Sequence, residues 1–226
     1  MFISLEGIDG AGKTKTAGYL VDMLRERGLH VTFAQHNATE VGDEYAAGYL
    51  ADLRKMTERY GDGPYFRLGL RHWIFMRASY YALVDHCVVT PALEAGHLVI
   101  ADGWYYKFAA RTAAARPDAS DTAIDLDQVL PIFSSVRAPD RVFLLDVPPD
   151  VAAERKGCFK AGELGPQNFW ANDRIQAFTS FQASVRQYLL SMSQANRWQA
   201  LDGTSGAALA IAESISTQLE FAGYLS

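Results

Sequence analysis

The chain has 226 residues, 49% of them hydrophobic, which is enough for a full buried core, and we expect one domain over residues 1–226. Its formal net charge of −5 and the scattering of Lys and Arg among acids argue against a nucleic-acid polymer as partner. No apolar run approaches the ~18 residues of a membrane span, and no leader pattern precedes Phe2. Cys87 and Cys158 lack metal-ligand spacing, which predicts reduced thiols. We therefore expect a cytoplasmic protein without a membrane partner.

Five short apolar runs alternate with helical patterns along the chain. Each run is too short for a helix and mostly apolar on both faces, as in the strands of a parallel sheet covered by helices on both sides. The runs are Phe2–Leu5, Leu29–Ala34, His97–Ala101, Arg141–Leu145 and, more weakly, Arg197–Leu201. The predicted helices are Lys13–Arg27, one long or divided helix over Tyr65–Ala95, Asp173–Ala195 and Ala207–Phe221. This alternation predicts a doubly wound α/β fold, whose ligand site lies at the carboxyl ends of the strands.

The most loop-like stretch is Gly157–Asn172, GCFKAGELGPQNFWAN, which precedes the helix predicted to begin at Asp173. Its three glycines and its proline disfavour a long regular element. This composition is typical of a lid, which we expect at about residues 157–172.

The stretch GIDGAGKTK after the first run fits the phosphate-loop pattern GxxxxGK(S/T). It follows a predicted strand and precedes a predicted helix, which is the context that the motif requires. Backbone N–H groups of such a loop surround phosphate oxygens, the lysine reaches the terminal phosphates, and the hydroxyl after it is a magnesium ligand. The sequence therefore predicts a site for the phosphates of a nucleoside triphosphate and for Mg²⁺. We expect its contacts from Gly7, Asp9, Gly10, Ala11, Gly12, Lys13, Thr14 and Lys15.

The loop alone is compatible with GTPase switches, ATP-driven motors and small-molecule kinases. The sequence contains neither an NKxD guanine signature nor an LSGGQ-like transporter signature. This favours a kinase of a small molecule.

Several passages resemble the thymidylate kinase family. FISLEGIDGAGKT resembles the family's opening almost position by position, including Asp9. TPALEAGHLVIADGW resembles the family's passage of helix, glycine, strand and Asp-Arg-aromatic motif. APDRVFLLDVPPDVAAERK resembles its fourth strand and the helix that leads to the lid, and DRIQAF resembles the helix after the lid. The resemblance implies a P-loop kinase with a five-stranded parallel sheet, helices on both faces and a short lid, commonly a homodimer. It also implies ATP- and magnesium-dependent phosphoryl transfer to a nucleotide, dTMP or a related nucleoside monophosphate.

The resemblance assigns roles to individual residues. Lys13 and the loop amides would hold the donor phosphates, Thr14 would ligate magnesium, and Asp102 would act on it through water. Arg155 would pack on the adenine or reach the transferring phosphoryl group, while Lys156 and Lys160 of the lid neutralise charge. Asp202, after the fifth run, matches a place where the family contacts adenine, although an ordinary strand-to-helix turn explains it equally well.

The acceptor side departs from the family in three places. Asp102-Gly103-Trp104 lacks the arginine of the Asp-Arg-aromatic passage. Ala38-Thr39-Glu40-Val41 keeps the acid of the family's Thr-Arg-Glu-Pro segment and loses its arginine. Counting back from Gly96 without gaps, the Phe-x-x-x-Arg pair that meets the thymine falls on Arg77 and Tyr81.

Losing these arginines should weaken dTMP binding unless others replace them, because each charge-assisted contact is worth roughly 1.5 to 3 kcal/mol. The candidate replacements are Arg71, Arg77 and Arg111, each of which is equally explained as a solvated or core-bracing side chain. The aromatic residues Tyr81, Trp104 and Tyr105 are candidates for stacking on a flat acceptor, although single aromatic residues more often belong to the core.

Glu40 leaves a second function open. A carboxylate near a magnesium-bound triphosphate can act as general base toward a hydroxyl, which predicts a kinase of a nucleoside or another small metabolite. A solvated loop acid beside Asp43 and Glu44 is the alternative explanation. Asp9 would hold a sugar hydroxyl in either case. A third possibility is a nucleotide-binding regulator without catalysis, suggested by the altered Asp102-Gly103-Trp104 passage.

Overall fold

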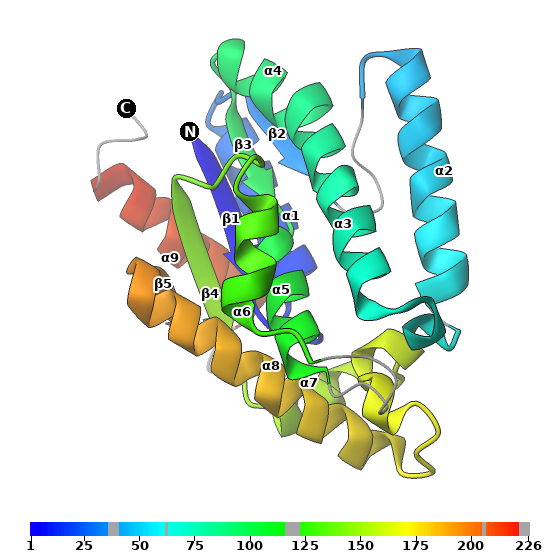
Figure 1. Ribbon diagram of the computed structural model, residues 1–226. Coiled ribbons are helices and arrows are strands. Elements are labelled where there is room, and N and C mark those ends of the chain that lie inside the picture. Colours follow the sequence, from blue (N-terminus) through cyan, green and yellow to red (C-terminus); the bar gives the residue numbers. More distant parts are fainter. Residues whose placement is uncertain (36–40, 62, 116–122, 205–206, 222–226) are drawn as a thin grey trace.

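The protein folds around a five-stranded parallel sheet with the strand order β2-β3-β1-β4-β5 (Figure 1). The computed structural model describes residues 1–35, 41–61, 63–115, 123–204 and 207–221. The strands are β1 (Phe2–Glu6), β2 (Val31–Ala34), β3 (Leu98–Ala101), β4 (Arg141–Asp146) and β5 (Gln199–Asp202). The predicted α/β fold is confirmed. Each strand overlaps one of the five apolar runs found in the sequence. The largest difference in the weak fifth run is at its start, because β5 begins at Gln199 and the run at Arg197.

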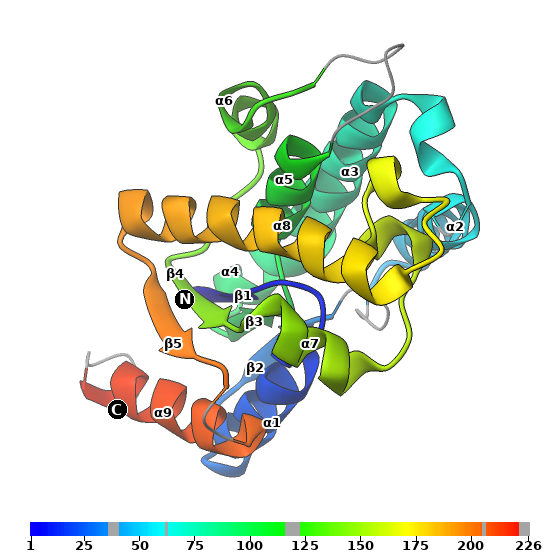
Figure 2. The ribbon, with the colours of Figure 1, turned by 90° about the horizontal axis from the view of Figure 1, so that it is seen from below.

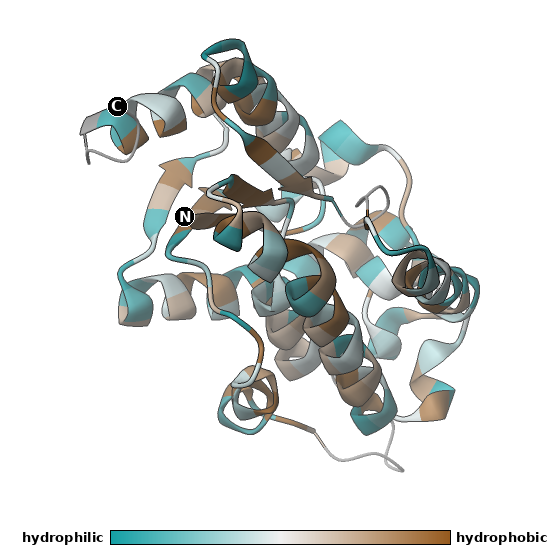
Figure 3. Cartoon of the chain, turned by 90° about the horizontal axis from the view of Figure 1, so that it is seen from above, coloured by the Kyte–Doolittle hydropathy of each residue, from teal (hydrophilic) through white to brown (hydrophobic). Residues whose placement is uncertain are grey.

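Alternate residues of β1 pack in different parts of the core, because successive side chains of a strand point to opposite faces of the sheet. Ile3 and Leu5 of β1 pack in one cluster, and Phe2 packs in another. Figure 2 shows α1 (Lys13–Glu26) and α9 (Ala208–Phe221) below the sheet, and α5 (Tyr105–Ala114) and α8 (Arg174–Asn196) above it. The inner strands of the sheet are strongly apolar in Figure 3, as expected where helices cover both faces.

The long helix predicted over Tyr65–Ala95 is divided. A 3₁₀ turn (Tyr65–Leu68) leads into α3 (Leu70–Val84), and a π-helical segment (Asp85–Val89) joins α3 to α4 (Thr90–Glu94). The π-helical segment inserts residues into the helical repeat, so sequence spacing across it does not follow the regular α-helical period.

Three further helices complete the described part of the chain: α2 (Glu44–Gly61), α6 (Leu126–Val129) and α7 (Pro149–Lys156). The helix α2 was not predicted from the sequence. Its buried residues Leu50, Leu53 and Thr57 recur with helical spacing, but most of the helix is polar and exposed. Within the described residues, no helix combines the length and the apolar character that crossing a membrane requires.

Candidate active site

A cavity of about 890 Å³ opens beside the phosphate loop and the carboxyl ends of β2, β3 and β5, marked by Ala34, Asp102 and Gly203. The residues that line the cavity carry a net positive charge, whereas the whole protein carries a net negative charge. Among the described residues that line it, eight are cationic and four are acidic, in a chain of net charge −5. The cations are Lys13, Lys15, Arg77, Lys107, Arg111, Arg155, Lys156 and Lys160, and the acids are Asp9, Glu58, Asp102 and Glu163. A cation-lined hollow in an acidic protein indicates an anionic ligand.

The phosphate loop joins β1 to α1 at one wall of this cavity. Residues 10–15 line the cavity, as expected for a triphosphate site. Gly10 has a φ of +85°, and a Cβ there would lie 2.7 Å from the carbonyl oxygen of Ala152, so a side chain has no room. The loop therefore packs directly against α7.

The Lys13 ammonium group lies buried over the loop and donates hydrogen bonds to the carbonyl oxygens of Gly7 and Ile8, both at 2.8 Å. Burial, followed by repulsion from Lys107, lowers the pKa of Lys13 to about 8. Phosphate oxygens would be stronger acceptors for this ammonium than two neutral carbonyls. Lys13 is thus placed to turn toward a triphosphate.

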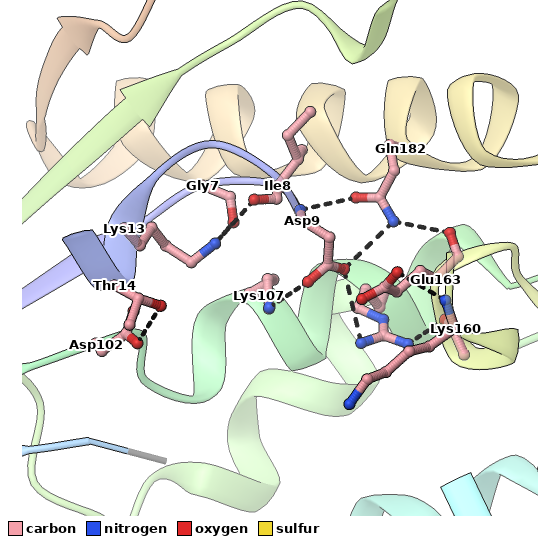
Figure 4. Close-up of polar contacts among 12 residues, drawn as sticks. Gly7, Ile8, Asp9, Lys13, Thr14, Asp102, Lys107, Lys160, Glu163 and Gln182 are labelled. Carbon is pink, nitrogen blue, oxygen red and sulfur yellow. Dashed lines mark hydrogen bonds and ion pairs between the residues drawn. The ribbon is translucent and has the colours of Figure 1, made fainter. Parts of the chain in front are cut away.

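Thr14 and Asp102 meet across the loop. The Thr14 hydroxyl donates to Asp102 Oδ2 at 2.6 Å, and Asp102 follows the last residue of β3 (Figure 4). No cluster of three or more His, Cys, Asp or Glu able to hold a metal occurs among the described residues. A hydroxyl and one carboxylate still suit Mg²⁺, which usually keeps several waters and takes further oxygens from substrate phosphates. The two residues predicted to serve magnesium are therefore adjacent.

Asp9, the acidic residue inside the loop, is surrounded by cations. Lys107 Nζ lies 2.8 Å from Asp9 Oδ1, and Arg111 Nη1 lies 3.8 Å from Asp9 Oδ2. Burial would raise the pKa of Asp9, but Lys107, Arg111 and Lys13 outweigh it and hold that pKa well below its ordinary value. Asp9 is therefore ionised. Lys107 was not singled out from the sequence, because its partner Asp9 lies 98 residues away.

A fully buried glutamine, Gln182 of α8, connects Asp9 to the lid segment. Its Oε1 accepts from the Asp9 backbone N–H at 3.2 Å, and its Nε2 donates to Asp9 Oδ2 at 3.4 Å and to the Glu163 carbonyl at 2.9 Å. No local motif distinguishes this residue in the sequence, because these partners are brought together only by the fold.

The segment expected to form a lid contains two 3₁₀ turns, Ala161–Glu163 and Pro166–Asn168. Glu163 accepts from the backbone N–H of Lys160 at 3.0 Å and pairs with Lys156 at 3.2 Å. Arg111 Nη2 donates to the carbonyl oxygen of Gly162. The side chains of α5 and α8 that meet Asp9 therefore also hold the first of these turns.

Arg155 and Asp202, both predicted to serve the donor, both contact Thr204 in the turn that follows β5. Arg155 lines the cavity, and its Nη2 lies 3.5 Å from the Thr204 carbonyl oxygen. Asp202 is exposed at the end of β5, where its Oδ1 accepts from the backbone N–H and hydroxyl of Thr204 at 2.8 and 2.6 Å. Asp202 thus shapes the turn that follows β5, and the neighbouring Gly203 lines the cavity.

Arg77 lines the far end of the cavity from α3. Its guanidinium lies over the rings of Tyr80 and Phe108, with centroid distances of 6.0 and 5.9 Å, and no carboxylate of the described residues pairs with it. Trp73, one helical turn earlier, also lines the cavity. The structure thus presents an aromatic residue and an arginine one turn apart at positions 73 and 77.

Three aromatic residues predicted to meet the acceptor are occupied by core contacts. Tyr81 donates from its hydroxyl to the Trp104 carbonyl at 3.1 Å, and Trp104 Nε1 donates to the Arg137 carbonyl at 2.9 Å. Tyr105 stacks on Phe133 with centroids 4.9 Å apart. Tyr81 and Trp104 still border the cavity, whereas Tyr105 is not among its lining residues.

The remaining acceptor-side predictions have different outcomes. Arg71 is exposed and does not line the cavity, so the structure does not bring it to the site. Thr39 and Glu40 lie outside the described residues.

Glu6 is a buried acid that the sequence analysis did not single out. Its Oε1 accepts from Ser4 Oγ at 3.0 Å and from the Trp104 backbone N–H at 2.7 Å, and its Oε2 has no partner among the described residues. Burial raises the pKa of Glu6 to about 7, against the opposing effects of these hydrogen bonds and of nearby lysines. Glu6 fixes the turn that carries Asp102 and Gly103. The available signal was an acid directly after the apolar run Phe2–Leu5, at the end of the strand.

Comparisons with known proteins agree with this geometry. The profile described as thymidylate kinase matches residues 5–215. The chain is 30% identical over 208 residues to the thymidylate kinase of Fervidobacterium nodosum, covering 90% of this chain and 91% of that protein. It is 28% identical over 212 residues to the thymidylate kinase of Chlorobium luteolum, with 91% of each chain covered. The probable thymidylate kinase of Archaeoglobus fulgidus is 31% identical over 167 residues, 74% of this chain and 73% of that protein.

Both the extent of these matches and the fold lead to one assignment. The chain belongs to the thymidylate kinase family and is a phosphotransferase that acts on a small nucleotide.

Proposed function

We propose that the protein transfers the γ-phosphoryl group of ATP, with Mg²⁺, to the phosphate of a nucleoside monophosphate, dTMP or a close relative. The observation that carries this proposal is the excess of cations in a cavity that is continuous with the phosphate loop. Such a cavity suits two anionic groups brought close together, a triphosphate and an acceptor phosphate, whose repulsion the protein must offset.

On the donor side, the loop amides and Lys13 hold the terminal phosphates. Thr14 and Asp102 would hold Mg²⁺, which when bound would neutralise charge on the donor phosphates. Arg155, Lys156 and Lys160 add positive charge from α7 and the segment after it. Arg155 is long enough to lie against the adenine or to reach the transferring group.

The reaction needs little covalent participation from the protein. An oxygen of the acceptor phosphate forms a bond to the γ-phosphorus while the bond from that phosphorus to the β,γ-bridging oxygen breaks, and ADP leaves with the electron pair. A phosphate dianion carries no proton that must be removed first, so catalysis consists of positioning and charge neutralisation.

On the acceptor side, Asp9 accepts a hydrogen bond from a sugar hydroxyl. Trp73 and Arg77 receive the base between an aromatic face and a planar guanidinium. No carboxylate of the described residues pairs with the Arg77 guanidinium. Burial without such a partner lowers the pKa of Arg77. Both observations support a role of Arg77 in binding the base. A hydrogen-bonding ligand would relieve that cost.

Phosphorylation of a hydroxyl with Glu40 as general base is the second candidate. Its motivation is the retained acid and the absence of arginine at positions 39 and 103. The cation excess of the cavity favours the anionic acceptor instead. A nucleotide-binding regulator without catalysis would not require the adjacent Thr14 and Asp102 pair.

A coupled assay of ADP release tests these functions against one another. We expect turnover with one or more nucleoside monophosphates, none with nucleosides, and loss of turnover in Lys13→Ala. Turnover of nucleosides alone would favour the hydroxyl kinase, and ATP binding without any ADP release would favour the regulator. Lys55→Gln on exposed α2 is a matched control, because Lys55 pairs with Asp52 outside the cavity.

We also propose a homodimer, as the family resemblance implies. The support in this chain is a set of exposed aromatic side chains on α2 and α3, where Tyr45 is 87% exposed and Phe75 is 62% exposed. Burying such side chains between two copies would remove apolar surface from water. Light scattering should give about twice the chain mass for the wild type, and Phe75→Asp should shift the population toward monomer if α3 lies in the interface.

A further inference from the structure

Two cations on one face of α5 point at the same carboxylate. Lys107 and Arg111 are four residues apart, so they lie on adjacent turns of the helix. Both contact Asp9, Lys107 through Oδ1 and Arg111 through Oδ2. Their side chains are 24% and 27% exposed and both line the cavity, which leaves each ammonium or guanidinium partly open to a ligand.

Asp9 alone does not balance the positive charge around it. Lys13 is a third cation near Asp9, because it acts on that carboxylate together with Lys107 and Arg111. Three cations thus surround the ionised carboxylate of Asp9. Two further acids act on Lys13: Asp102, and Glu6, whose pKa is raised to about 7 by burial so that it supplies little negative charge below that pH. This region retains a surplus of positive charge that an anion would neutralise.

Lys13 and Lys107 reach the cavity from different elements of the fold. Lys13 belongs to the loop and the first turn of α1, on the donor side. Lys107 comes from α5, and Figure 4 shows its side chain pointing toward Asp9, to which its ammonium group donates at 2.8 Å. Phe108, next to Lys107, borders the same cavity and lies against Arg77. Through Lys107 and its neighbour Phe108, α5 therefore contacts both Asp9 of the phosphate loop and Arg77 of α3.

We propose that Lys107 binds the acceptor's phosphate and selects a phosphorylated acceptor over the corresponding neutral nucleoside. The inference rests on the proposed function. On binding, the ammonium is shared between Asp9 and the phosphate, while Arg111 keeps Asp9 paired. Gly103, at the turn before α5, contributes no side chain to this wall, so Lys107 and Arg111 are the cations that α5 supplies.

The test measures binding without turnover. Calorimetry in the absence of ATP compares dTMP, dAMP, dGMP and dCMP with their parent deoxynucleosides, and the readout is the ratio of the nucleoside Kd to the monophosphate Kd. We expect the wild type to bind at least one monophosphate more tightly than its nucleoside. Lys107→Gln should reduce that ratio about 10- to 150-fold by weakening monophosphate binding alone, the effect of losing one charge-assisted contact. Lys107→Arg should retain part of the preference, and the Lys55→Gln control should keep all of it.

A double substitution separates phosphate binding from mere pairing with Asp9. If Lys107 only neutralises Asp9, then Asp9→Asn combined with Lys107→Gln should restore the wild-type ratio. If Lys107 contacts the phosphate, the double variant should keep the low ratio of Lys107→Gln. Asp9→Asn alone weakens the monophosphate and the nucleoside alike through their sugar, so it leaves the ratio nearly unchanged.

The outcomes for this inference and for the proposed function are distinct. A ratio that changes by less than about threefold in Lys107→Gln overturns the role of Lys107, even if the wild type phosphorylates monophosphates. A wild type that binds no monophosphate better than its nucleoside also overturns it. Failure of the wild type to release ADP with any monophosphate, although it binds them through Lys107, would instead contradict the proposed phosphoryl transfer.

Discussion

Replacing Glu6 by glutamine should remove a pH dependence from the stability of the protein. The carboxyl group is fully buried, its Oε2 has no partner among the described residues, and burial raises its pKa from 4.5 to about 7. Below pH 4.5 the group is protonated in the folded and the unfolded chain. Between pH 4.5 and about 7 the unfolded chain loses the proton while the folded chain keeps it, so stability falls as the pH rises.

The size of this effect follows from the shift. A difference of about 2.5 pH units at 1.36 kcal/mol per unit lowers the free energy of unfolding by about 3 kcal/mol between pH 4.5 and pH 8. The amide oxygen of the Glu6→Gln variant would accept from the Trp104 N–H in the same way, but the amide would not titrate. Its NH₂ group, placed where Oε2 now lacks a partner, would cost about 1–3 kcal/mol at every pH, and therefore does not change the slope.

Urea unfolding of the wild type and Glu6→Gln at intervals from pH 4.5 to 8 measures this slope. The difference in unfolding free energy between the two proteins should change by about 3 kcal/mol in favour of the variant as the pH rises. Titration of the other groups cancels in the difference. Parallel curves for the two proteins would refute the assignment of a neutral, buried Glu6.

Three further substitutions test the site. Gly10→Ala should lower ATP affinity and destabilise the protein by more than ~1–2 kcal/mol, because φ is +85° and the new Cβ would lie 2.7 Å from the Ala152 oxygen; calorimetry and urea unfolding measure the two effects. Asp102→Asn should raise the Mg²⁺ concentration needed for half-maximal turnover by roughly 10- to 100-fold, and an unchanged magnesium titration would remove Asp102 from the metal site. Gly103→Arg should cost ~1–2 kcal/mol of stability because the φ of Gly103 is +81°. It should not raise dTMP turnover, because Lys107 already supplies positive charge at this wall. Increased turnover would show that the wild type lacks a needed charge at position 103.

The strands and the phosphate loop could be predicted because their signals are local. A short apolar run predicts a buried strand, and the spacing from Gly7 to Thr14 specifies a loop whose geometry lies within one segment. The helix α2 was missed because its buried residues are few and its surface is polar. Its recurrence of Leu50, Leu53 and Thr57 was the signal that an explicit count of helical spacing would have found.

The acceptor side was harder to predict because its contacts are distant in the sequence. Asp9 meets Lys107 and Gln182 across 98 and 173 residues. Counting back from Gly96 placed the aromatic-arginine pair on Arg77 and Tyr81, and both residues line the cavity. Trp73 lines it as well, so that an aromatic residue and an arginine lie one turn apart at positions 73 and 77. The aromatic residues Trp104 and Tyr105 were candidates for stacking on the acceptor. Tyr105 packs on Phe133 instead, since an aromatic-rich helix start also meets the core.

The central claim is transfer of the γ-phosphoryl group to a phosphate rather than to a hydroxyl. Phosphorus NMR of the protein with ATP, Mg²⁺ and one nucleoside monophosphate at a time observes the product directly. The account predicts that the resonances of a nucleoside diphosphate appear together with those of ADP, for dTMP or a related monophosphate. ADP accompanied only by inorganic phosphate, or by a newly phosphorylated sugar hydroxyl, would contradict it.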